Sequence, residues 1–313
     1  MVSENMDTIY FSDDWLLPKY YGWVALVREE NAVVFFKRVL FISKIIVLSC
    51  DLGAQEVNVI LDKLSYNRFL TRIYWHNFTN VDSEESPMSP QATTDAAQIR
   101  LGSRWYEKAS DSNKLIHWAT YIINLEKEID QILSEMESTV RNKFRRAQKK
   151  GAIVTFETEI GKWTEDFYKL FERLQEEFGL SVPDHNMLHE IFAGKNAVAV
   201  VGHDASGVSA INIIYLAKPY AYYMLGASSH SKEQGVGQLM QLETINYLKS
   251  KGFKKYDLGG VNAAQPGILT FKKSFGVDFY DLGSEWIHTP TMIGILLKIR
   301  FFLTKLRSNP VLT

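Results

Sequence analysis

The sequence predicts an α/β protein of two domains, and three observations lead to this prediction. The chain has 313 residues, about twice the ~150 that an ordinary domain contains. It is 46% hydrophobic and 23% charged, a composition typical of globular proteins and unlike that of disordered chains. Runs rich in β-branched and aromatic residues alternate with runs whose apolar residues recur at helical spacing, which excludes an all-helical or all-β chain.

The first third of the chain reads as strands followed by a helix. Strands are expected at residues 22–27, 32–36, 39–49 and 72–75, a helix at 56–68, and a mobile loop rich in Ser, Pro, Thr and Asp at 81–97. The turn-like residues 28–31 make the first two strands a hairpin.

A second unit begins near Leu115. Strands are expected at residues 119–125, 152–157, 197–201, 208–216, 220–225 and 255–258, with helices at 126–150, 163–178 and 237–251. Gly151 follows the first of these helices, where a residue without Cβ suits a left-handed C-terminal cap. We therefore divide the chain into a first domain, 1–115, a second domain, 116–289, and a C-terminal segment, 290–313.

The C-terminal stretch Thr291–Arg307 interleaves apolar residues with lysine and arginine. It predicts a helix that packs on the first domain or, alternatively, lies on a membrane surface where anionic headgroups attract the basic side chains. No uninterrupted apolar run reaches the ~18 residues of a spanning helix, and the N-terminus carries acidic residues where a signal peptide carries basic ones. The lone Cys50 cannot form an intramolecular disulfide. We expect a cytoplasmic protein, with peripheral contact at the inner membrane face as the alternative.

A glycine motif stands between a strand and a helix, in the order Lys232-Glu233-Gln234-Gly235-Val236-Gly237. Glycines at a helix start let backbone N–H groups approach a phosphate at the positive end of the helix dipole. Lys232, Gly235 and Gly237 are therefore candidates for binding the phosphates of a donor substrate. A plain strand-to-helix turn explains the same pattern equally well.

A basic helix end is the second candidate for phosphate contact. It carries Arg141, Lys143, Arg145, Arg146, Lys149 and Lys150, although the net charge of the chain is only −1. The functional reading assigns phosphate contacts to Arg141, Arg145 and Arg146; the alternative is a solvated face favoured by the helix dipole. Asp257 either orients a substrate or caps the turn at Gly259-Gly260. His185 and His189 are four residues apart but lack a third ligand, so no metal site is predicted.

Several segments resemble, in order and spacing, the Fem family of peptidoglycan aminoacyltransferases, which have the GNAT acyltransferase fold. They are residues 120–125 with 141–151, Tyr222–Ser228, Asp257–Val261 and 267–276, so that the resemblance extends from about residue 115 to the C-terminus. It implies two GNAT-like domains in tandem, with mixed sheets flanked by helices and a basic, apolar C-terminal helix. The first domain departs from the family, with Ser49–Ala54 in place of a Pro-Arg-Gly-Pro-like turn, which leaves the acceptor open.

The resemblance also implies the activity. Fem-like enzymes move an aminoacyl (or acyl) group to an amine of a cell-wall precursor by direct attack, with no metal, tightly bound cofactor or covalent intermediate. By this resemblance Lys272 stabilises the oxyanion, and Phe271 and Tyr223 complete the catalytic set. Without the resemblance, Phe271-Lys272-Lys273 reads as part of a strand or turn in which Lys272 is a solvated lysine. The donor is aminoacyl-tRNA or acyl-CoA. Two alternatives are an acyl-CoA-dependent N-acetyltransferase acting on an amino sugar or other small amine, and a catalytically silent binding protein.

Overall fold

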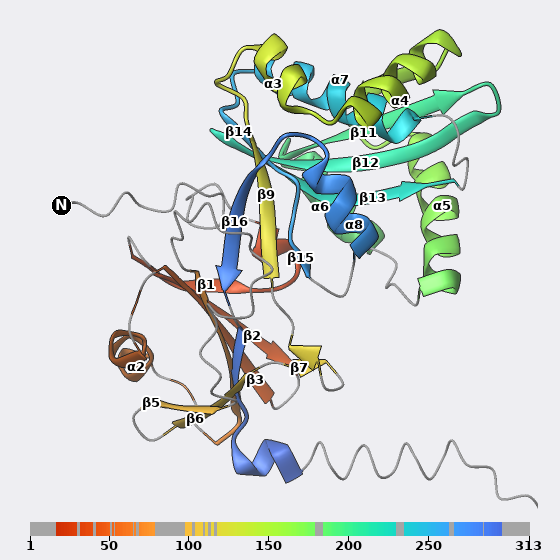
Figure 1. Cartoon of the computed structure of the whole chain (residues 1–313). Coiled ribbons are helices and arrows are strands. Elements are labelled where there is room, and N and C mark those ends of the chain that lie inside the picture. Colours follow the sequence, from red (N-terminus) through yellow and green to blue (C-terminus); the bar gives the residue numbers. More distant parts are fainter. Residues whose placement is uncertain are drawn as a thin grey trace, which may run out of the picture. The chain divides into compact units, whose positions relative to one another are not determined.

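The computed structural model describes residues 17–29, 32–39, 42–50, 52, 54–64, 66, 69–78, 98–101, 104–108, 110–111, 114–115, 118–178, 184–229, 235–262, 266–283 and 285–295. The chain divides into two compact units (Figure 1). One is formed from residues 22–118 and 281–313, and the other from residues 119–280 together with the segment that holds α1 (Leu17–Tyr20).

The first unit is a mixed sheet with one helix. It contains β1 (Val24–Glu29), β2 (Ala32–Val39), β3 (Ile42–Cys50), α2 (Ala54–Lys63), β4 (Thr71–Phe78), β5 (Gln98–Leu101), β6 (Arg104–Lys108) and β17 (Glu285–His288), beside a ribbon of β7 (Ser110–Asp111) and β8 (Lys114–Leu115). The strand order is β1-β2-β3-β4-β17-β6-β5. Alternate residues of the strands, such as Ile45 and Val47, form a core with Val57 and Leu61 of α2.

The second unit is a larger mixed sheet flanked by helices. It contains β9 (Trp118–Asn124), α3 (Ile129–Glu135), α4 (Ser138–Lys149), β10 (Ile153–Glu157), α5 (Trp163–Phe178), α6 (His185–Ala193), β11 (Ala197–Asp204), β12 (Gly207–Ala217), β13 (Tyr220–Ser228), α7 (Val236–Ser250), β14 (Lys255–Asp257), β15 (Val261–Asn262), α8 (Pro266–Lys273) and β16 (Asp278–Gly283). The strand order is β10-β11-β12-β13-β14-β9-β15, and β16 pairs with β9.

The two units repeat one pattern, which confirms the predicted tandem α/β fold. In each, antiparallel strands lead through a helix into a strand that pairs in parallel with the last of them: β1-β2-β3-α2-β4 in the first unit and β11-β12-β13-α7-β14 in the second. A strand from a distant part of the sequence then adds in antiparallel fashion, β17 beside β4 and β9 beside β14. The sequence-based division assigned residues 285–288 to the second domain, whereas β17 lies in the first sheet because its backbone pairs there.

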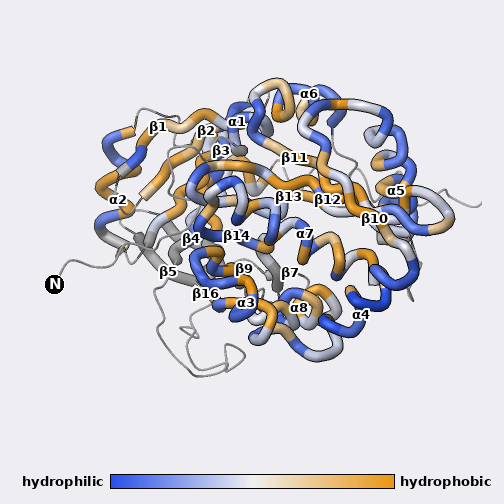
Figure 2. The backbone as a smooth tube through the Cα atoms, turned by 90° about the horizontal axis from the view of Figure 1, so that it is seen from above, coloured by the Kyte–Doolittle hydropathy of each residue, from blue (hydrophilic) through white to orange (hydrophobic). Residues whose placement is uncertain are grey.

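One face of the second sheet is covered by α3, α4 and α7, which lie together above it in Figure 1. Val198 and Val200 of β11 share a core with Leu239 and Met240 of α7 and Phe144 of α4. Figure 2 shows the central strands β11–β13 as largely hydrophobic and much of α4 as hydrophilic. The apolar stripe of α4 is therefore used in packing, and its other face is left polar.

Two sequence predictions were wrong about helices. The helix expected over residues 126–150 is two helices, because Met136 and Glu137 adopt extended backbone with ψ of 146° and 143°. The Glu137 N–H donates to the carbonyl of Ser274 at 3.0 Å, so a turn far along the chain docks at the break. Phe271–Lys273, expected on a strand or turn, ends helix α8. Gly151, in contrast, has the expected left-handed φ of 79°.

The predicted C-terminal helix lies mostly outside the described residues. Residues 291–295 are helical, whereas 296–313 and the expected loop at 81–97 are not described. Among the helices that the structure does describe, none is long and apolar enough to cross a membrane.

Candidate functional site

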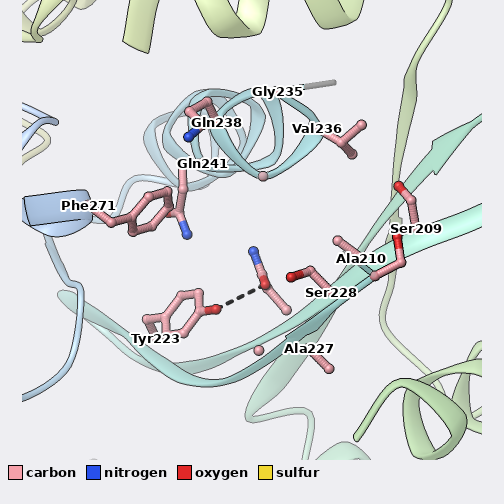
Figure 3. A pocket seen from close by; sticks show the side chains of 14 residues that line it. Ser209, Ala210, Tyr223, Ala227, Ser228, Gly235, Val236, Gln238, Gln241 and Phe271 are labelled. Atoms are coloured by element: carbon pink, nitrogen blue, oxygen red, sulfur yellow. Dashed lines mark hydrogen bonds between the residues drawn. The ribbon is translucent and has the colours of Figure 1, made fainter. Parts of the chain in front are cut away.

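A cavity of about 380 Å³ lies in the second unit between β12, β13 and the first turns of α7 (Figure 3). Asn212 of β12, Tyr223 of β13, Gln241 of α7 and Phe271 of α8 contribute to its walls, together with glycines, serines and small apolar residues. None of the described lining residues is charged. The cavity is large enough for part of a small-molecule substrate, and its walls offer hydrogen bonds rather than ion pairs.

Strand geometry opens this part of the sheet. The parallel pairing of β13 with β14 extends only from Tyr220 to Tyr222, so the two strands no longer pair beyond that point. The register of β12 against β13 also shifts between Ile213 and Ile214, which marks a bulge beside Tyr223. Backbone groups and side chains near Tyr223 are consequently available to a substrate instead of being used in the sheet.

The two glycines of the phosphate motif serve different purposes. Gly235 begins α7 with a left-handed φ of 70°, and a Cβ there would collide with the backbone carbonyl of Lys143 in α4. Gly237 lines the cavity, and a Cβ there would meet nothing within 4 Å. Gly235 therefore permits helix packing, while Gly237 leaves room for a ligand. Lys232 lies outside the described residues.

A partly buried tyrosine and a buried one donate hydrogen bonds to two buried amides at the cavity. The Tyr223 hydroxyl donates to Asn212 Oδ1 at 3.0 Å, marked by the dashed line in Figure 3, and the Tyr256 hydroxyl donates to Gln241 Oε1 at 3.0 Å. Burial raises the pKa of both tyrosines, so both remain protonated donors. A side chain at Gly226 would collide with the Tyr223 hydroxyl, so glycine is what admits this tyrosine.

Asp257 lies at the end of β14 and is only 2% exposed. Its Oδ1 accepts hydrogen bonds from Thr120 Oγ1 at 2.5 Å and from the Gly259 N–H at 2.7 Å, whereas its Oδ2 has no partner among the described residues. Burial raises the pKa of Asp257 to about 6, against the lowering effects of these hydrogen bonds and of Lys272. The expected capping of the Gly259-Gly260 turn is thus present, and the substrate-orienting role stays a prediction.

Lys272 is buried beneath that same turn. Its Nζ donates to the carbonyls of Gly259 at 2.6 Å and Gly260 at 3.4 Å, and burial lowers its pKa to about 8 while Asp257 raises it. Phe271 and Tyr223 both line the cavity, but Lys272 is not among the lining residues. The structure therefore brings Phe271 and Tyr223 together and places Lys272 one layer behind them, with its neighbour Lys273 exposed.

The side chains of the basic helix end differ in their surroundings: Arg141 is hydrogen-bonded to backbone carbonyls, whereas others are exposed. Arg141 Nη1 donates to the carbonyls of Leu133 at 3.1 Å and Ser134 at 3.2 Å and also to that of Met136, and so it caps the end of α3. This capping engages Nη1 and accounts for Arg141 without a phosphate, whereas its assignment to a phosphate stays a prediction.

Arg145 and Arg146 are exposed, as is Lys143. Within the described part of the chain, none of these three pairs with an acidic side chain. Because the backbone of Lys143 lies against Gly235, which lines the cavity, α4 passes beside the start of α7 at this point. The exposed basic face is defined here as Lys143, Arg145 and Arg146 of α4.

The histidine pair lies on α6, away from the cavity walls. The His185 ring stacks on Tyr168 with centroids 3.6 Å apart. Among the described residues no group of three His, Cys, Asp or Glu side chains is arranged to hold a metal ion.

Sequence reasoning missed Asn212, Gln241, Thr120 and Tyr256. A signal for two of them was present: Asn212 interrupts the apolar run Ala210–Leu216, and Gln241 interrupts a run of apolar residues on α7. A polar residue within a buried run needs a hydrogen-bond partner, and such residues are candidates for function.

Comparison with known proteins supports this description. Residues 134–273 match the model of a GNAT acetyltransferase domain, which covers the cavity and both catalytic candidates that line it. A search of curated protein sequences found no match.

Solved structures extend the likeness to both units. The crystal structure of FemX aligns with a TM-score of 0.58 and 16% identity, over 88% of this chain and 90% of FemX. The C-terminal domain of a candidate lysylphosphatidylglycerol synthetase from Agrobacterium fabrum aligns with a TM-score of 0.53 and 13% identity, over 91% and 90%. A conserved protein of unknown function from Bacteroides thetaiotaomicron gives 0.52 and 10%, over 89% and 90%. At these identities the likeness concerns the fold. Residues 134–273 thus resemble a GNAT acetyltransferase domain, which supports an acyltransferase activity, and the chain shares its fold with FemX.

Proposed function

We propose that this acyltransferase transfers an acyl or aminoacyl group from a phosphate-bearing donor to an amine of a cell-envelope precursor. The observation that carries the proposal is the position of the uncharged cavity at the start of α7, where Gly235 lies against Lys143 of the exposed basic face. Backbone N–H groups at the helix start and the nearby cations suit the phosphates of the donor, and the cavity suits its acyl end.

The reaction depends mainly on alignment of the amine with the donor carbonyl and on stabilisation of the charge that develops on the carbonyl oxygen. The neutral amine attacks the ester or thioester carbonyl, the C–N bond forms, the bond to the donor oxygen or sulfur breaks, and the amine proton passes to the leaving group. Tyr223 is a protonated hydroxyl in the cavity and Phe271 is an apolar wall opposite it. Lys272 contributes as a positioning residue, because its ammonium holds the carbonyls of the turn after β14.

Two donors fit different parts of the site. The exposed basic face favours a polyanion such as aminoacyl-tRNA, which agrees with the Fem-like fold. The uncharged walls favour the second candidate function, an acyl-CoA-dependent N-acetyltransferase acting on an amino sugar or other small amine. Both donors are cytoplasmic molecules, so the proposal places the protein in the cytoplasm, with the inner membrane face as the place of contact for a lipid-linked acceptor. It requires no metal and no tightly bound cofactor.

The test compares two glycine variants in a transfer assay that offers acetyl-CoA or aminoacyl-tRNA to amino-sugar and peptide acceptors, with products detected by mass spectrometry. Gly237→Val fills the cavity from α7, whereas Gly267→Val adds the same atoms to exposed space at the start of α8. We expect Gly237→Val alone to weaken the donor by about 10-fold or more, equivalent to about 1.4 kcal/mol. No turnover of either donor by the unaltered protein would leave only the binding-protein alternative.

A further inference from the structure

We propose that Asn212 and Gln241 determine donor specificity, by donating hydrogen bonds from their amide nitrogens to oxygen atoms on an uncharged acyl group in the cavity. The inference rests on the proposed function and narrows it, because it selects an uncharged acyl end over an aminoacyl end with a free ammonium group. Neither residue belongs to the glycine motif or to the segments that resemble Fem proteins.

Both amides are buried at the cavity wall. Asn212 is 6% exposed and Gln241 is 2% exposed, although each lines the cavity. The oxygen of each amide accepts a tyrosine hydroxyl, while neither Asn212 Nδ2 nor Gln241 Nε2 donates to any described residue. Neither nitrogen is among the fully buried, unpaired atoms of the described residues, so the N–H groups are open at the cavity wall, where a ligand or water can accept their hydrogen bonds.

The tyrosines decide which end of each amide faces the ligand. A protonated hydroxyl that donates to the amide oxygen leaves the nitrogen at the opposite end of the group, toward the cavity. Figure 3 shows the nitrogen of Gln241 directed from α7 into the space bounded by Phe271 and Tyr223. The two tyrosine hydrogen bonds and the space that Gly226 leaves for Tyr223 are present without a ligand, so the amides are held in this orientation beforehand.

The charge of the walls then selects the ligand class. Each amide nitrogen carries two N–H donors, and these complement carbonyl, hydroxyl or amide oxygens. An ammonium group in the same place would face N–H donors and would find no carboxylate among the described lining residues. Burying a cation without a counter-charge is strongly unfavourable. The cavity is therefore complementary to an uncharged acyl group whose oxygen accepts these hydrogen bonds.

The experiment exchanges the amide nitrogens for carboxylate oxygens of the same shape. In Asn212→Asp and Gln241→Glu the tyrosine hydroxyls keep an acceptor, but the cavity gains an acceptor and a negative charge. Gln148→Glu is the matched control, because it makes the same exchange at an exposed position of α4 that is not among the residues lining the cavity.

The probes are matched pairs that differ in one group. Propionyl-CoA and glycyl-CoA differ by a methyl group in place of an ammonium group, as do the propionyl and glycyl amides of 3′-amino-3′-deoxyadenosine. Dissociation constants are measured for all four by calorimetry. We expect the unaltered protein to bind the CoA pair or the adenosine pair. Within that pair, the propionyl probe should bind at least 10-fold more tightly than the glycyl probe. Asn212→Asp and Gln241→Glu should each reduce this preference at least 10-fold, and Gln148→Glu should change it less than about threefold.

Gln241→Met keeps the test decisive if the charged variants do not fold, since it removes the N–H donors without adding charge and should weaken the propionyl probe about 10-fold. The inference would be overturned if the protein binds its probe and Asn212→Asp, Gln241→Glu and Gln241→Met all leave the preference unchanged. The proposed function would then still stand. Preference of the unaltered protein for the glycyl probes would also overturn it. Failure to bind any of the four probes would refute the inference and the proposed function together.

Discussion

Replacing Lys272 by methionine tests how the buried charges beneath the cavity are balanced. The substitution removes an ammonium that donates to the carbonyls of Gly259 and Gly260 and leaves the carboxylate of Asp257, 2% exposed, without a nearby cation. Removing one member of a buried charged pair typically costs about 3–5 kcal/mol. Burial of the Lys272 charge is itself unfavourable, since it lowers the pKa of this lysine to about 8. The substitution removes that buried charge, which offsets part of the cost. Because this offset amounts to about 3 kcal/mol, we expect Lys272→Met to lower the free energy of unfolding by about 1 kcal/mol at pH 7.5.

The pH dependence of this destabilisation identifies its cause. The folded pKa of Asp257 is raised from 3.8 to about 6, so the stability linked to its protonation is fully present below 3.8 and lost as pH rises through 6. Without Lys272 the folded pKa rises further, so the variant goes on losing stability above pH 6. The difference between the two proteins should therefore shrink at pH 5, by about 1 kcal/mol for each unit of that further rise. The lysine is protonated in both states at pH 5 and adds little to this trend.

The assay is urea denaturation at pH 5 and pH 7.5, with two controls. Lys273→Met removes an exposed lysine one residue along and should change stability by less than about 0.5 kcal/mol. The double variant Lys272→Met with Asp257→Asn removes the uncompensated charge and should be more stable than Lys272→Met at pH 7.5 but not at pH 5. An equal destabilisation at both pH values, or no recovery in the double variant, would refute the reasoning.

Two further predictions concern the start of α7 and the basic helix. Gly235→Ala should lower stability by more than 2 kcal/mol, because the position combines a left-handed φ with a collision against the carbonyl of Lys143, whereas Gly237→Ala should be neutral or slightly stabilising in the same denaturation assay. Neutralising Arg145 and Arg146 should reduce the slope of log affinity against log salt for tRNA by nearly one unit for each phosphate that the protein no longer binds. Arg141→Gln should instead destabilise the fold by about 1–3 kcal/mol without changing that slope, and a changed slope would restore Arg141 to the phosphate site.

Local patterns in the sequence correctly predicted most of the helices and strands and the type of fold. Local periodicity placed α5 at Trp163–Phe178 and marked the strands from β9 to β14, because alternation and helical spacing reflect which residues face a core. The glycine motif likewise indicated the start of α7 and, with it, one wall of the cavity. These features depend on neighbours within a few residues, which is the range over which a sequence pattern carries information.

The contacts between segments far apart in the sequence became visible in the three-dimensional structure alone. The helix over residues 126–150 breaks because Glu137 bonds to Ser274, and β17 joins the first sheet across a long stretch of sequence. The pairing of Tyr223 with Asn212 and the burial of Lys272 beneath Gly259 also depend on such long-range interactions. Hydrogen bonding and desolvation act between groups that are close in space, so no local pattern could show that Arg141 caps a helix or that two amides face a cavity.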